Sequence, residues 1–160
     1  AMERFLDQKN KDLFLKFGVF SLAEMQSRHD ILLENYSKII NIEARTSVDM
    51  LVHQILPAAL AYTKTLCESI ATKKQLGIPC GAETSLANKL SEAADNCYEK
   101  CEQLRQSLLH VPANSAEASV YYHDVVVSSM EDLRKEADIL EALTDKNYWP
   151  YPTYSDLLYY

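Results

Sequence analysis

Glycine and proline are scarce in this chain, which has three glycines and five prolines among 160 residues. Tight turns depend on these residues, and a sheet protein needs many turns whereas a few long helices need few. The composition therefore predicts an all-α fold. It also excludes a phosphate-binding loop, because three scattered glycines form neither G-x-x-x-x-G-K-[ST] nor G-x-G-x-x-G.

Basic residues are also few, and the formal net charge is −7. The only adjacent basic pairs are Lys73-Lys74 and Arg134-Lys135. Because phosphate backbones are bound by clustered Lys and Arg, we expect no nucleic-acid partner. No apolar run reaches the roughly 18 residues of a membrane span, and the first residues lack a signal peptide's apolar core. The sequence thus predicts no membrane contact and a cytoplasmic location.

Residue types with catalytic or metal-binding chemistry do not form a recognisable motif. Cys97 and Cys101 share one helical face, but no C-x-x-C or H-x-x-x-H accompanies them, which favours buried reduced thiols over a metal or redox site. His29 and His123 are expected on apolar stripes that can face each other, as structural histidines. Glu34 is expected on a solvated face or in an ion pair, like Glu43. We therefore predict no catalytic, cofactor-binding or metal-binding residue in this chain.

Helical periodicity covers the first half of the chain. A short helix is expected from Asp7 to Phe17, with Gly18 as its C-terminal cap. Ser21 and Glu24 form a capping box that opens a helix running to Gly77-Ile78-Pro79. Its apolar stripe comprises Leu33, Tyr36, Ile40, Ala44, Ser47, Leu51, Ile55, Ala58, Tyr62, Leu66 and Ile70. About 55 helical residues span roughly 80 Å, too long for a compact ball of this chain length.

Proline 57 lies inside this long stripe. It removes one backbone donor and clashes with the carbonyl of His53, so a bend is expected there. Because the stripe keeps its phase from Leu51 to Tyr62, the helix is predicted to continue through Pro57 without a loop.

Two further long helices are predicted after a loop over 77–84. The next helix is expected to begin at Thr84 or Ser85, and the last to run from Ser115 to about Thr144 after a turn at Pro112 and Asn114. Their stripes comprise Leu86, Leu90, Ala94, Cys97, Cys101, Leu104 and Leu108, and Val120, His123, Val127, Met130, Leu133, Ala137 and Leu140. Short connections force neighbouring helices to run in opposite directions. The expected architecture is an elongated antiparallel bundle of three long helices, in one domain spanning 1–160.

The C-terminal tail, 146–160, alternates aromatic residues with prolines and is predicted to be extended. Each aromatic side chain can bury roughly 150–250 Å², so the tail is expected to dock on the bundle or on a neighbouring domain. The candidate docking residues are Tyr148, Trp149, Tyr151 and Tyr154. Trp149 is predicted to anchor the tail within the chain, with some of the tyrosines facing outward.

Several segments resemble one known family. They are Gly18-Val-Phe-Ser21, Leu33-Glu-Asn-Tyr36, Asn41-Ile-Glu-Ala44 and the ending Trp149-Pro-Tyr-Pro-Thr-Tyr154. In this order they resemble the region that follows the catalytic barrel in type III glutamine synthetases. Between about Cys67 and Tyr122 the likeness is one of helical character only.

The resemblance implies a parent enzyme that joins glutamate and ammonia with ATP and Mg²⁺ or Mn²⁺, and that assembles as stacked hexameric rings. In that family the nucleotide and metal sites lie in the upstream barrel, so no such residue is carried onto this chain. The implied role is an accessory, non-catalytic domain whose partners are the upstream barrel and other copies of the parent. The alternative is a stand-alone helical interaction or sensor module.

Overall fold

The computed structural model describes residues 4–152 and 154–158, and within them every regular element is helical. In chain order these are α1 (Gln8–Lys16), α2 (Leu22–Met50), a π-helical turn η2 (Leu51–Ile55), α3 (Leu56–Gln75), α4 (Gly81–Leu109), α5 (Ser115–Tyr121), a second π-helical turn η3 (Tyr122–Val126), α6 (Val127–Leu143) and α7 (Tyr154–Leu158). The all-α prediction is confirmed.

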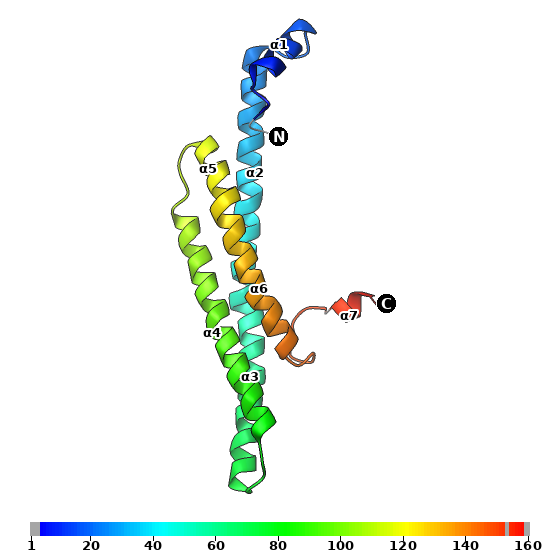
Figure 1. The fold of residues 1–160 in the computed structure, drawn as a ribbon, viewed down its shortest axis with the longest axis vertical. Coiled ribbons are helices and arrows are strands. Elements are labelled where there is room, and N and C mark those ends of the chain that lie inside the picture. The colour runs from blue at the N-terminus through cyan, green and yellow to red at the C-terminus, as the bar shows by residue number, and fades with distance from the viewer. Residues whose placement is uncertain (1–3, 153, 159–160) are drawn as a thin grey trace.

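The helices form three long rods that lie side by side in an elongated antiparallel bundle (Figure 1). The first rod is α2–η2–α3, the second is α4, and the third is α5–η3–α6. The second rod packs along α3 and α6, and α5 packs along α2. The N-terminal part of α2 extends past the end of α5 and carries α1 at its tip (Figure 1). The predicted architecture is therefore confirmed.

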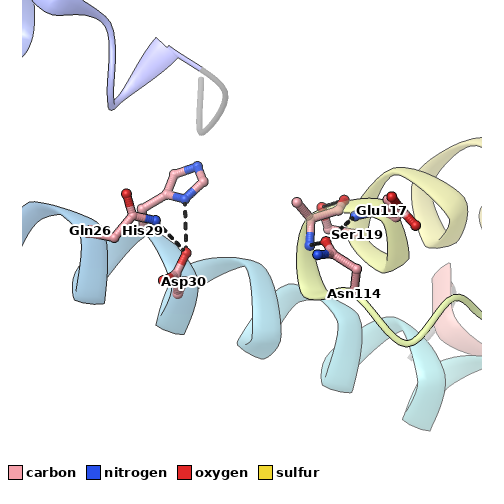
Figure 2. Close-up of polar contacts among 7 residues, drawn as sticks. Gln26, His29, Asp30, Asn114, Glu117 and Ser119 are labelled. Atoms are coloured by element: carbon pink, nitrogen blue, oxygen red, sulfur yellow. Dashed lines mark hydrogen bonds and ion pairs between the residues drawn. The ribbon is translucent and has the colours of Figure 1, made fainter.

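Helix ends follow the predicted chemistry at most positions. The Ser21 hydroxyl accepts a hydrogen bond from the Glu24 N–H at 3.2 Å, and the Glu24 carboxylate accepts one from the Ser21 N–H at 2.7 Å. Gly18 has φ +62°, the left-handed backbone typical of a helix C-terminal cap. Asn114 caps α5 by accepting from the N–H groups of Ala116 and Glu117 (Figure 2).

The predicted start of the second rod is wrong. It begins at Gly81 after Cys80, a few residues before Thr84, and no side chain caps it. Glu83 lies in its first turn and forms an ion pair with Lys73 at the end of α3. A carboxylate at a helix N-terminus is stabilised by the helix dipole, and this pair also holds the two helix ends together.

The first rod continues as a helix through Pro57, as predicted, with no loop between Leu51 and Tyr62. The helix departs from regular α-helical geometry at η2, a wider π-helical turn that ends two residues before Pro57. Local π-helical turns are one way in which a helix accommodates proline or strain. The core position after Ile55 is consequently Ala59, which is fully buried, whereas the prediction had placed Ala58 there.

The first part of the predicted stripe on the third rod is also wrong. Val120 is 50% exposed and His123 projects into solvent, while Ser119, Tyr122 and Val126 are buried. Each buried residue precedes a predicted one by one position. The expected stripe steps by three residues twice in succession, from Val127 to Met130 to Leu133, which runs ahead of the 3.6-residue period. Two α-helical turns before Leu133 lies Val126, and this is the residue that is buried.

Candidate docking site under the C-terminal tail

A tight turn brings the tail back onto the bundle after α6. The Asp145 carboxylate accepts hydrogen bonds from the backbone N–H and the side-chain amide of Asn147, at 2.8 and 2.9 Å. The Asp145 carbonyl accepts from the N–H groups of Tyr148 and Trp149, at 2.9 and 3.1 Å. This Asx-type turn means that the tail, predicted to be extended from Tyr148, begins with a reversal of direction.

Tyr148 lies against α3. Its ring centroid is 5.3 Å from that of Tyr62, and its hydroxyl lies 2.8 Å from the Thr65 hydroxyl. An aromatic pair at this distance is favourable, and the hydrogen bond fixes the position of the ring. Tyr62 belongs to the predicted stripe, but nothing in the sequence marked Thr65 as a partner because it occupies an exposed helical position.

Trp149 and Tyr151 both pack against the hydrophobic core. They form one wall of a cavity of about 260 Å³ between the first and third rods. Its other walls comprise Ser47, Met50, Leu51, Ile55, Met130, Leu133, Arg134, Ala137, Asp138, Glu141 and Pro152. The lining is mainly apolar, so it suits aromatic and aliphatic side chains such as those the tail supplies.

One polar atom in this region is buried without a partner. The Tyr151 hydroxyl has no hydrogen-bond partner within the part of the chain that the structure describes. Burial raises the pKa of Tyr151, and the negative charge of Asp49 raises it further. Both effects keep the phenol protonated. On the cavity wall, Arg134 Nε lies 3.7 Å from Asp138, which places a charged pair beside the apolar lining.

The last helix leaves the bundle. Figure 1 shows α7 standing away from the three rods. Lys146 in the turn forms an ion pair with Asp156 of α7, whereas Leu157 and Leu158 are 66% and 74% exposed. The structure thus brings Tyr148, Trp149 and Tyr151 onto the bundle, and the side chain of Tyr154 lies outside the described residues.

The two cysteines predicted to be buried and reduced are both free thiols in the core of α4. Burial raises the pKa of Cys97 to about 12, with a smaller contribution from the neighbouring Cys101. Burial also raises the pKa of Cys101. Such thiols are poor nucleophiles and metal ligands, because both roles require the thiolate.

The two histidines do not face each other as predicted. His29 lies 3.4 Å from Asp30 on α2 (Figure 2), and His123 lies 2.7 Å from Asp124 on the exposed side of η3. His123 lies one position after the buried Tyr122, so its side chain points outward. Glu34 is exposed and pairs with Lys38 at 3.3 Å, as expected for a solvated face.

The described residues contain no group of three or more His, Cys, Asp or Glu side chains placed to bind a metal ion. In the same residues, no helix combines the length and the apolarity that crossing a membrane requires.

The fold and the tail define an elongated all-α bundle domain with an aromatic segment folded back onto it. Residues 1–74 match the family described as "Glutamine synthetase C-terminal domain". The chain is 33% identical over 163 residues to a glutamine synthetase of Butyrivibrio fibrisolvens. It is 29% identical over 168 residues to the type-3 glutamine synthetase of Dictyostelium discoideum. The predicted resemblance to the C-terminal helical domain of a type III glutamine synthetase is confirmed.

These alignments cover 99% of this chain but only 23% of each relative. A third glutamine synthetase, from Bacteroides fragilis, is 22% identical with the same coverage. The chain therefore corresponds to a domain within much longer proteins.

Proposed function

We propose that this chain is the accessory C-terminal domain of an ATP-dependent glutamate–ammonia ligase and is not itself catalytic. The observation that carries the proposal is the similarity to glutamine synthetases along 99% of the chain, together with the match to their C-terminal domain family. ATP and Mg²⁺ or Mn²⁺ bind in the longer enzyme, in its catalytic barrel. The enzyme works in the cytoplasm and assembles from several copies.

The bundle braces the catalytic barrel through its tail. The aromatic part of the tail contacts the bundle, with Tyr148 hydrogen-bonded to Thr65 and Trp149 packed on the core. The following helix, α7, presents Leu157 and Leu158 to its surroundings. In this proposal the segment 146–160 docks on both sides, holding the bundle through its first half and a neighbouring domain through its second.

Activity and binding measurements on the chain and on the longer enzyme test the proposal. We expect the chain to form no glutamine and to bind no ATP in calorimetric titrations with magnesium, while the longer enzyme does both. A longer enzyme in which 146–160 is deleted is expected to lose activity or assembly. Stoichiometric micromolar ATP binding by the chain alone would contradict the proposal.

The stand-alone alternative is tested at the level of the gene. A reading frame that continues several hundred residues upstream and encodes a catalytic barrel supports the accessory role. A stop codon directly upstream of Met2 would instead support an independent interaction module.

A further inference from the structure

A second apolar face runs along α2, on the side turned away from the bundle. Leu32, Ile39 and Ile42 are 46%, 56% and 63% exposed. Ala44, fully buried, is two residues from Ile42 and therefore lies about 160° away around the helix. A surface helix with one buried stripe normally carries polar residues on its opposite face. This helix instead carries large aliphatic side chains on two faces.

The exposed face has the spacing of a coiled-coil seam. Its positions alternate by three and four residues and comprise Leu32, Asn35, Ile39, Ile42 and Thr46, which we call the α2 seam. Alternating spacings of this kind place successive side chains along one line that a second helix can cover. Ile31, 54% exposed, borders the seam and widens its apolar surface.

We propose that the α2 seam pairs with the α2 seam of a second copy of this chain, in parallel and in register. The charges beside the seam favour this arrangement. Lys38 and Glu43 flank the seam on opposite sides and are five residues apart. In a parallel coiled coil this separation brings Lys38 of each copy to Glu43 of the other, so the ion pair forms twice.

The opposite orientation is disfavoured by the same residues. An antiparallel pair brings together the flanks that carry Lys38 and Arg45, so like charges face each other. Asn35 supports the in-register pairing, because a side-chain amide both donates and accepts and can therefore bond to its own copy across a two-fold axis. A polar residue inside an apolar seam fixes the alignment at some cost in affinity.

The length of the seam sets the strength of the pairing. From Leu32 to Thr46 it covers roughly 22 Å of helix at 1.5 Å per residue. An interface of this length falls at the small end of specific protein contacts, so the dimer is weak and depends on protein concentration. The inference concerns a surface of the chain itself and does not depend on the ligase activity of the longer enzyme.

Sedimentation equilibrium over about a hundredfold range of concentration tests the pairing. We expect the mass to rise from monomer toward dimer, and Ile39→Glu to raise the dissociation constant at least about tenfold, because it places two like charges in the seam. Leu60→Glu is the matched control, since Leu60 is 55% exposed on α3, away from the seam. Circular dichroism checks that each variant keeps its helix content. A monomer at every concentration, or equal effects of the two substitutions, would overturn the proposal.

A charge exchange tests the orientation. Lys38→Glu and Glu43→Lys are each expected to weaken the dimer, since each replaces an attraction between copies by a repulsion. The double variant is expected to restore most of the affinity, because it re-forms both pairs with their signs exchanged. A double variant as weak as the single ones would overturn the parallel register.

Discussion

Replacing Trp149 with alanine removes an indole that packs against the hydrophobic core of the bundle. Trp149 is half-buried and packs against the core beside Leu51 and Leu133. An indole buries roughly 150–250 Å², and apolar burial contributes about 25 cal/mol per Å². The product is about 4–6 kcal/mol for full burial. Since Trp149 keeps some exposure and borders a cavity into which the tail can relax, we expect a loss of about 3 kcal/mol.

Urea denaturation followed by circular dichroism at 222 nm measures this loss in the 160-residue chain. Tryptophan fluorescence is unsuitable, because Trp149 is the only tryptophan and is absent from the variant. Tyr98→Ala is the control, since Tyr98 is 53% exposed on α4 and should change stability by less than about 1 kcal/mol. A Trp149→Ala effect no larger than that of the control would refute the anchor.

Three further outcomes follow from individual contacts. Tyr148→Phe and Thr65→Ala should show a coupling energy of about 0.5–1 kcal/mol in a double-mutant cycle, and strictly additive effects would exclude the hydrogen bond. At pH 8, iodoacetamide should label the exposed Cys67 in the folded chain but should label Cys97 only after unfolding. The reason is that burial shields the Cys97 thiol and raises its pKa to about 12. Labelling of both cysteines at the same rate in the folded chain would contradict this. Hydrogen bonds from the backbone and side chain of Ser21 lower the pKa of Glu24 below its usual 4.5. The contribution of ionised Glu24 to the free energy of unfolding is therefore present above pH 4.5 and is lost as the pH falls through the lower pKa of the folded state. Glu24→Gln should therefore flatten the acid limb of stability against pH, and an unchanged limb would show that other carboxylates control it.

Helix positions and caps were predictable because they depend on neighbouring residues in the chain. Gly18 and the Ser21 capping box act through bonds within a few residues, and each lies where the sequence placed it. Asn114, expected in a turn, is the N-cap of α5. The start of α4 was not predictable in this way. It depends in part on the ion pair between Lys73 and Glu83, ten residues apart, which forms only once the two helices pack together.

The core face of the third rod was predicted correctly after Met130 and incorrectly before it. The stripe departs from the 3.6-residue period because it steps by three residues twice in succession between Val127 and Leu133, and it therefore names Val127 where Val126 is buried. Packing across the bundle selects the buried set there. The docking site was predictable only in part, since aromatic composition identified Tyr148 and Trp149 but not the surface that receives them. Trp149 lies on a surface made by the contiguous α2 and η2 together with α6, about eighty residues further along the chain, and Tyr148 lies against α3.

The two π-helical turns let the number of residues in a rod change without rotating one half of the rod against the other. A π-helical turn holds one residue more than the α-helical turn that it replaces. Deleting one residue within η2 can therefore restore a regular α-helix without breaking the rod. The same deletion would leave α3 close to its present rotation about the rod axis, with Ala59 and Tyr62 still facing their neighbours, whereas a deletion in a regular α-helix would rotate all that follows by about 100°. These turns are thus the points at which a rod can lose a single residue, remain helical and keep the same residues in the core on both sides.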